Sequence, residues 1–192
     1  MTDDQPRTTD DGLFVLTGPV HSGKTTFLAG AAARWRASGI DVGGFLSEAR
    51  RAGGGLDGYD LVDMKDGTSA LFLTRSGEPD WPSVGPYRFV PEALERARGI
   101  LLRDRDADLV VVDEVGPAEL EGGGLWPALA EALASGTRCL FVVRDTILEE
   151  LRARIGSPEP RVFRHGVPGI LESLTDALTA DRAERRPRGG SA

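Results

Sequence analysis

A glycine-rich stretch near the N-terminus contains the residue types that bind phosphate groups. Residues 18–25 read Gly-Pro-Val-His-Ser-Gly-Lys-Thr and match the pattern G-x-x-x-x-G-K-[ST] in full. Glycines let the backbone wrap closely, so that successive N–H groups point at phosphate oxygens. We expect Lys24 to reach the β and γ phosphates as a positive charge and the Thr25 hydroxyl to bind Mg²⁺. The pattern therefore predicts a site for a nucleoside triphosphate with magnesium.

Two acids follow an apolar run and form the expected second half of this site. Asp113 and Glu114 come directly after residues 109–112, which read Leu-Val-Val-Val. Parallel sheets bind ligands at the carboxyl ends of their strands, where these acids would lie. We expect Asp113 to hold Mg²⁺ through water, and Glu114 to orient or deprotonate an attacking water. The alternative is two surface acids at a strand end, and the phosphate loop disfavours it.

Arg144 directly follows a second apolar run, residues 139–143. A cation at this edge could stabilise charge on the γ phosphate, as an arginine supplied in cis does. The alternative is a salt bridge to Asp145 or Glu149. The sequence leaves both interpretations open.

Two histidines lie where they could meet the nucleotide. His21 is inside the glycine-rich stretch and could touch phosphate or water, or point outward while its backbone binds. His165 follows the last predicted strand and could approach the base, or be structural. No N-K-x-D sequence occurs, so the usual guanine-reading element is absent, and we expect weak base selectivity.

The elements that position these residues alternate along the chain. Apolar runs predict strands at residues 13–16, 42–47, 110–112, 139–143 and 161–163. Helical spacing of apolar residues predicts one helix that follows residue 25 and ends at Ser38-Gly39. It also predicts helices at 91–101, 125–133, 146–155 and 170–178. A capping box of Thr146 and Glu149 is expected to open the fourth helix. The alternation predicts a parallel sheet with helices on both faces.

Residues 48–90 break this pattern. A turn at residues 51–55 and short strands at 59–62, 68–73 and 87–90 predict a β-rich insertion at one edge of the sheet. We expect one domain over residues 12–180, with disordered ends at residues 1–11 and 181–192.

Composition narrows the classes of protein. The formal net charge is −7, which disfavours sequence-independent nucleic-acid binding. The chain has no run of about 18 apolar residues, so no membrane span is predicted. The polar N-terminus has no apolar stretch typical of a signal peptide. The single cysteine, Cys139, is expected to be a buried strand residue. These features favour a cytoplasmic protein without nucleic-acid or membrane partners.

The motifs together resemble a known family, the small P-loop nucleoside-triphosphatases first described in thermophiles, which include the human cancer-related nucleoside-triphosphatase. The resemblance covers most of residues 13–165. The matching stretches are Leu16–Thr26, Gly43–Glu48, Gly58–Leu61, Val84–Tyr87, Val111–Leu120 and Val142–Arg144. Two departures are Val20-His21-Ser22, in place of a Pro-Gly-Val type of loop, and Pro117-Ala118, in place of a Lys-Met type of pair.

The resemblance implies a RecA-like α/β sandwich in which a further strand separates the phosphate-loop strand from the acidic strand. It implies slow hydrolysis of ATP, GTP and other nucleotides with little base preference. It also implies that Gly18–Thr25 bind phosphate and that Asp113–Gly116 line the magnesium and water site.

The sequence thus predicts a three-layer α/β P-loop domain with a β-hairpin insertion, and Mg²⁺-dependent hydrolysis of nucleoside triphosphates. The alternatives are a nucleotide or small-molecule kinase, and a nucleotide-switched assembly factor whose hairpin around Gly53 contacts an unidentified protein partner. Lys24, Glu114 and Arg144 are the predicted catalytic residues, and Thr25 and Asp113 the predicted metal ligands. The predicted nucleotide contacts are Gly18, Pro19, Val20, His21, Ser22, Gly23, Lys24, Thr25, Thr26, Asp113, Glu114 and Gly116.

Overall fold

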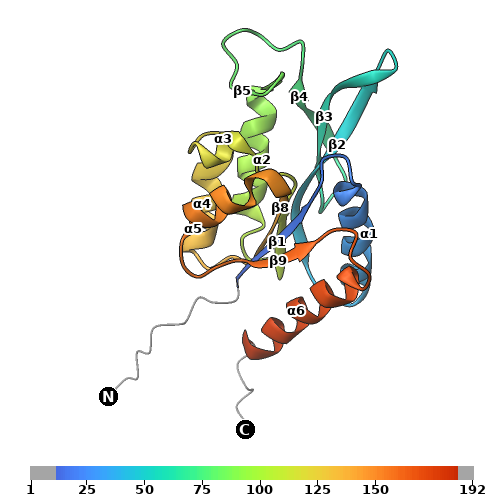
Figure 1. Cartoon of the computed structure of the whole chain (residues 1–192), viewed down its shortest axis with the longest axis vertical. Coiled ribbons are helices and arrows are strands. Elements are labelled where there is room, and N and C mark those ends of the chain that lie inside the picture. Colours follow the sequence, from blue (N-terminus) through green and yellow to red (C-terminus); the bar gives the residue numbers. More distant parts are fainter. Residues whose placement is uncertain (1–11, 186–192) are drawn as a thin grey trace.

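The computed structural model describes residues 12–185 and contains one mixed sheet of nine strands. The strand order is β5-β6-β4-β3-β2-β7-β8-β1-β9 (Figure 1). The predicted strands form a parallel half made of β1 (Leu13–Gly18), β2 (Val42–Ala52), β7 (Leu109–Val112), β8 (Cys139–Arg144) and β9 (Arg161–Arg164). Strand β8 lies between β1 and β7, as the family resemblance implied.

Helices cover both faces of the sheet, which confirms the predicted three-layer arrangement (Figure 1). Side chains of α1 (Lys24–Ala37) and α6 (Ile170–Arg185) pack on one face. The other face packs against α2 (Pro91–Arg103), α4 (Trp126–Ala134) and α5 (Leu148–Ile155). The short helix α3 (Pro117–Leu120) and the 3-10 turn η1 (Asp145–Ile147) lie in the connections and were not predicted.

The central strands are apolar throughout because both of their faces are covered. Phe14 and Leu16 of β1 belong to the core under α1 and α6, whereas Val15 belongs to the opposite core. Successive side chains of a strand alternate between faces, so each strand contributes to two cores. Cys139 is fully buried in β8, as predicted, and burial raises the pKa of its thiol to about 12.

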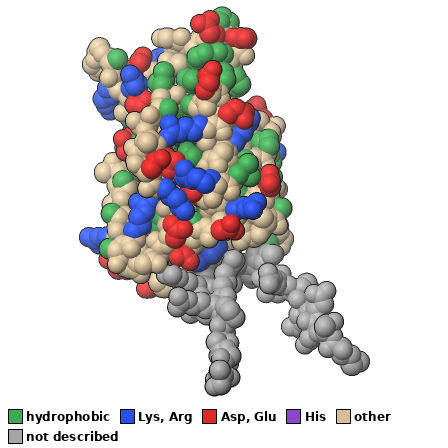
Figure 2. Space-filling view, turned by 180° about the vertical axis from the view of Figure 1, so that it is seen from behind, with side chains coloured by type: hydrophobic (Ala, Val, Ile, Leu, Met, Phe, Trp, Pro, Cys, Tyr) green, Lys and Arg blue, Asp and Glu red, His purple; other side chains and the backbone are tan. Residues whose placement is uncertain are grey.

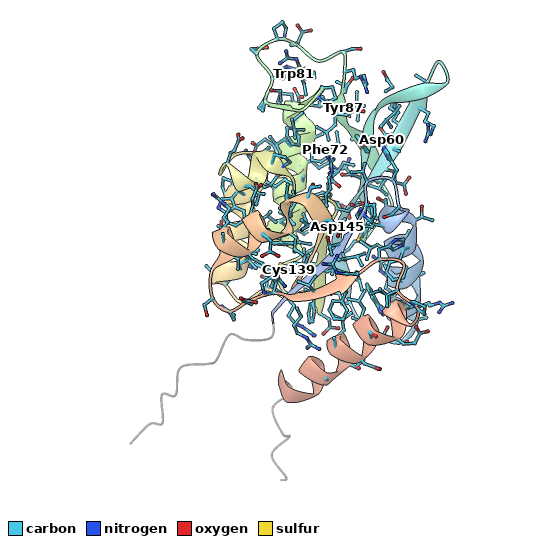
Figure 3. All side chains as sticks on the ribbon, in the orientation of Figure 1. Asp60, Phe72, Trp81, Tyr87, Cys139 and Asp145 are labelled. Carbon is cyan, nitrogen blue, oxygen red and sulfur yellow. The ribbon has the colours of Figure 1, made fainter. Side chains whose placement is uncertain are left out.

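The β-rich insertion continues the same sheet, as predicted. It contains β3 (Gly55–Asp63), β4 (Ser69–Thr74), β5 (Ser83–Val84) and β6 (Tyr87–Phe89), of which β5 was not predicted. The first part of β2 pairs in parallel with β7, and the rest extends as an antiparallel hairpin with β3. Figure 3 shows Phe72, Trp81 and Tyr87 in this upper part of the molecule.

The predicted capping box at the start of α5 was wrong. This helix begins at Leu148, and no side chain caps its N-terminus. The chain leaves β8 through η1 instead, where the Asp145 carboxylate accepts a 2.8 Å hydrogen bond from the Thr17 hydroxyl. This tie to the end of β1 draws the chain into a tight turn, and the helix starts after Thr146.

The C-terminal end of the domain differs from expectation at α6. Helix α6 continues to Arg185, past the predicted domain end at residue 180, and the remaining predicted disordered residues, 1–11 and 186–192, lie outside the described part. Within residues 12–185, no helix is long and apolar enough to cross a membrane. Figure 2 shows acidic and basic side chains interspersed on the face turned away in Figure 1.

Candidate active site

The phosphate loop connects β1 directly to α1. Strand β1 ends at Gly18 and the helix begins at Lys24, with Gly23 in the left-handed conformation at φ 92°. No side chain caps the N-terminus of α1. The free N–H groups of this first turn and the positive end of the helix dipole therefore face the loop, an arrangement that binds anions.

Two polar side chains inside the loop are arranged for an incoming anion. The Lys24 ammonium donates to the carbonyl oxygens of Gly18 at 2.9 Å and Pro19 at 2.7 Å. The hydroxyl oxygen of Ser22 is buried and has no hydrogen-bond partner among the described residues. Buried polar atoms are normally paired, so an unpaired hydroxyl here favours a ligand that accepts a hydrogen bond from it. By contrast, Val20 and His21 of the loop and Thr26 of the first helical turn are exposed.

Asp113 brings three elements together at the end of β7. Its carboxylate accepts a 2.6 Å hydrogen bond from the Thr25 hydroxyl of α1 and a longer one, 3.4 Å, from the Ser47 N–H of β2. The Ser47 hydroxyl also donates to the Asp113 carbonyl. Burial, opposed by these hydrogen bonds and assisted by the charge of Glu114, raises the pKa of Asp113 to about 7. A cation beside Asp113 would restore its charged form.

Glu114 and Arg144 form an ion pair across the ends of β7 and β8. The predicted alternative partners of Arg144 were therefore wrong. Asp145 instead accepts hydrogen bonds from Thr17 and Arg164, and Glu149 pairs with Arg152. Figure 3 places Asp145 near the middle of the molecule, below the insertion. The Nε of Arg144 is buried and has no hydrogen-bond partner in the described part of the chain. The buried Nε of Arg144 is thus available to a further acceptor.

The insertion approaches this ion pair through an aromatic residue. Burial, the neighbouring Tyr87 and the negative charge of Glu114 raise the pKa of Tyr59. The two tyrosine rings pack edge to face with centroids 5.4 Å apart. The β-rich edge thus places Tyr59 within electrostatic range of Glu114 and Arg144.

Glu119, to which the sequence analysis assigned no role, holds the backbone that follows the acidic pair. Its carboxylate is almost fully buried and accepts hydrogen bonds from the N–H groups of Gly116 at 2.9 Å and Leu125 at 3.1 Å. Burial raises the pKa of Glu119, although these two donors oppose the shift. A glutamate three residues after Gly116, with Pro117 at the first helical position, is the sequence signal of such a cap.

The oxygen donors present fit magnesium. Thr25 supplies a hydroxyl and Asp113 a carboxylate, and both are hard oxygen ligands. Among residues 12–185, no three His, Cys, Asp or Glu side chains gather into a site that could hold a metal. Sites for magnesium nucleotides usually hold the ion through one or two protein ligands, and phosphate oxygens and water supply the others.

Comparisons with known proteins identify the family. The NTPase family model matches residues 13–164. The nucleoside-triphosphatase THEP1 of Methanopyrus kandleri is 34% identical over 154 residues, which are 80% of this chain and 84% of that protein. The protein of the same name from Thermofilum pendens is 35% identical over 134 residues, 69% of this chain and 73% of that protein.

Two solved structures are also similar. The solution structure of a human cancer-related nucleoside triphosphatase has 28% identity and a TM-score of 0.65, covering 91% of this chain and 99% of that one. The crystal structure of THEP1 from Aquifex aeolicus shares the fold, with 21% identity and a TM-score of 0.67, over 86% of this chain and 98% of that one. With its phosphate loop and acidic strand inside the matched region, the chain belongs to the NTPase family, a family of nucleoside-triphosphatases.

Proposed function

We propose that this protein hydrolyses nucleoside triphosphates to diphosphates and phosphate, with Mg²⁺ and with weak base selectivity. One observation carries the proposal: the Thr25 hydroxyl of the phosphate loop lies 2.6 Å from the Asp113 carboxylate at the end of the acidic strand. The two halves of the predicted site meet, and Glu114 is the next residue.

Each side chain has a distinct role in this proposal. Lys24, now bonded to loop carbonyls, exchanges these for phosphate oxygens and holds the β and γ groups. Thr25 and Asp113 would hold Mg²⁺, which when bound would neutralise charge on those phosphates. Glu114 accepts the proton of the attacking water or holds that water in line.

Arg144 has two partners in the proposed cycle. It pairs with Glu114 in the structure, and its buried Nε has no hydrogen-bond partner among the described residues. A γ phosphate bound at the end of β8 offers acceptors to this guanidinium as charge grows on the phosphate oxygens. Release of Glu114 from the pair increases its basicity at the moment when water must be activated.

The same phosphate contacts are available to every nucleoside triphosphate. Phosphate oxygens do not differ between ATP and GTP, and the chain contains no N-K-x-D element to read guanine. We expect ATP and GTP to be hydrolysed at rates within about one order of magnitude, a difference of about 1.4 kcal/mol in the barrier.

A phosphate-release assay tests the function. Purified protein is incubated with Mg²⁺ and each nucleotide in turn, with and without nucleosides, nucleoside monophosphates and other small hydroxyl acceptors. We expect phosphate release without an acceptor, and none from Lys24→Ala. Diphosphate that forms only when an acceptor is added, with the phosphoryl group recovered on the acceptor and no free phosphate, would identify a kinase instead. A hundredfold preference for one base would contradict the weak selectivity.

A further inference from the structure

The order of the strands indicates on which side of the phosphate loop the nucleoside end of a bound triphosphate would lie. The groups proposed to act on the γ phosphate, Asp113, Glu114 and Arg144, lie at the ends of β7 and β8. Strand β1, which carries the phosphate loop, lies between β8 and β9. A triphosphate whose terminal group meets these acids must extend its other end across the loop, away from β7 and β8. That direction leads to the β9 side.

His165 is the residue that the β9 side presents to the phosphate loop. Its N–H donates to the Thr17 carbonyl at 2.7 Å, which extends the contact between β9 and β1 beyond the last strand residue. A Cβ added to Gly18 would lie 3.2 Å from the His165 Cβ, and one added to Gly23 would lie 4.0 Å from its Cε1. The imidazole therefore lies alongside both glycines of the loop motif.

The ring is held there by α1. His165 packs edge to face against Phe27, with ring centroids 5.4 Å apart. Figure 1 shows the segment after β9 passing beside α1. The side chain is only half-buried, and Val167, two residues further along, is 51% exposed. The loop thus combines a supported aromatic ring with an exposed apolar side chain.

The charge of this ring suits an uncharged partner better than a phosphate. Burial and the nearby Lys24 ammonium lower the pKa of His165, which favours the neutral imidazole when no nucleotide is bound. A neutral ring adds no positive charge for binding phosphate, whereas its flat face can stack on another aromatic ring.

We propose that residues 165–169 form the nucleoside subsite, in which the ring of His165 stacks on the base of the bound nucleotide and Val167 covers its apolar edge. This inference rests on the proposed function, because it assumes a nucleoside triphosphate in the loop. Stacking uses the face that every base has and reads no hydrogen-bonding edge. The subsite therefore contributes affinity for the nucleoside without selecting ATP over GTP.

Binding of two ligands that differ only in the nucleoside part tests this subsite. With Mg²⁺ present, calorimetry measures the affinity of the full chain for β,γ-imido-ATP and for inorganic tripolyphosphate. The variants are His165→Ala, His165→Phe and, as a matched control, Ser173→Ala on the exposed first turn of α6. Thermal melts of each variant verify that it is folded.

We expect His165→Ala to weaken binding of the imido nucleotide at least about fivefold, since stacking of one base contributes about 1–3 kcal/mol. Binding of tripolyphosphate should change less than about twofold. His165→Phe should retain most of the nucleotide affinity because it keeps the ring face, and Ser173→Ala should match the parent with both ligands.

Three results would overturn the subsite. Equal weakening of both ligands by His165→Ala means that the side chain acts on phosphate or on the loop itself. Unchanged binding of both means that it touches neither. Equal losses in the Ala and Phe variants mean that a ring nitrogen, not the face, makes the contact. Because these are binding measurements, a parent that binds the nucleotide but releases no phosphate would refute hydrolysis and leave the subsite standing.

Discussion

Glu114 lies beside two groups, Asp113 and Arg144, whose charges bear on the basicity of its carboxylate. Asp113, the preceding residue, is buried next to the Thr25 hydroxyl, and Arg144 pairs with the Glu114 carboxylate from the neighbouring strand. The Glu114 side chain remains partly exposed, so water can reach it. A carboxylate next to the proposed metal ligand and open to water suits a general base.

We expect Glu114→Gln to lower kcat by about 10²–10⁴ while nucleotide affinity stays close to that of the parent. The amide keeps the shape and can still accept a hydrogen bond from Arg144, but it cannot take a proton. Single-turnover assays and equilibrium binding measure the two quantities separately. Glu121→Gln, an exposed glutamate in the same segment, is the control. A near-parental rate for Glu114→Gln would mean that the base lies elsewhere.

Arg144→Ala should lower kcat with little change in KM, because we propose that its guanidinium meets charge that grows as the γ phosphate departs. Steady-state kinetics measures both constants. If Arg144 also acts through Glu114, the double variant with Glu114→Gln should lose less than the product of the two single effects. A change in melting temperature alone, with unchanged kcat, would reduce Arg144 to a structural ion pair.

At the scale of elements, β2 joins the parallel half of the sheet to the insertion, and a glycine allows its close contact with β7. Gly44 has φ 93°, and a Cβ at this position would lie 1.9 Å from the Val111 carbonyl oxygen of β7. This close approach holds Ser47, three residues later, against Asp113.

Gly44→Ala should therefore destabilise the protein by at least about 2 kcal/mol, through backbone strain and a clash with β7. Denaturant unfolding measures this loss. The matched control is Gly30→Ala in α1, where an added Cβ has no atom within 4 Å. Because alanine favours a helix, Gly30→Ala should be neutral or more stable by up to about 1 kcal/mol. Equal effects in the two variants would contradict the packing argument.

The loop between β7 and α4 depends on Glu119 in a similar way. Glu119→Gln leaves one acceptor oxygen for two N–H donors and turns an amide N–H₂ toward the other, which should cost about 1–3 kcal/mol of stability. Because Gly116 follows the acidic pair closely, we also expect a lower kcat with little change in KM. Kinetics well below the variant's melting temperature separates the effects, and an unchanged kcat would leave Glu119 a purely structural role.

At the scale of the whole molecule, the net charge of −7 gives an anionic nucleotide no general attraction. Binding must come from the local donors of the loop and from magnesium. The free energy of that binding is added to the stability of the folded chain, because the unfolded chain has no phosphate loop.

A slowly hydrolysed nucleotide at about 100 times its Kd, with Mg²⁺, should stabilise the protein by about 2.7 kcal/mol. For a domain of this size, that raises the melting temperature by about 5–10 °C. Chelation of magnesium should remove most of the shift, and Lys24→Ala should show little of it. A shift that persists in full after chelation would contradict the role of Thr25 and Asp113 as metal ligands.

The sequence by itself determined the features that depend on neighbouring residues. The phosphate loop is eight consecutive residues, the acidic pair follows its own apolar strand, and the helices repeat apolar residues at their own spacing. Local backbone chemistry and periodicity carry such features, so the three-layer fold and the Asp113 position could be predicted. The capping box at Thr146 was local too, but a distant contact, between Thr17 and Asp145, overrode it.

Only the tertiary structure decided which distant segments meet. Arg144 pairs with Glu114 because β8 lies beside β7, and His165 reaches the phosphate loop because β9 lies beside β1. Ser47 of β2 contacts Asp113 at the end of the neighbouring strand β7, and Glu119 contacts Leu125 across a turn. No spacing within the sequence specifies strand order, because pairing depends on which apolar faces can be buried together. The partners of these side chains were therefore set by packing of the sheet and its helices.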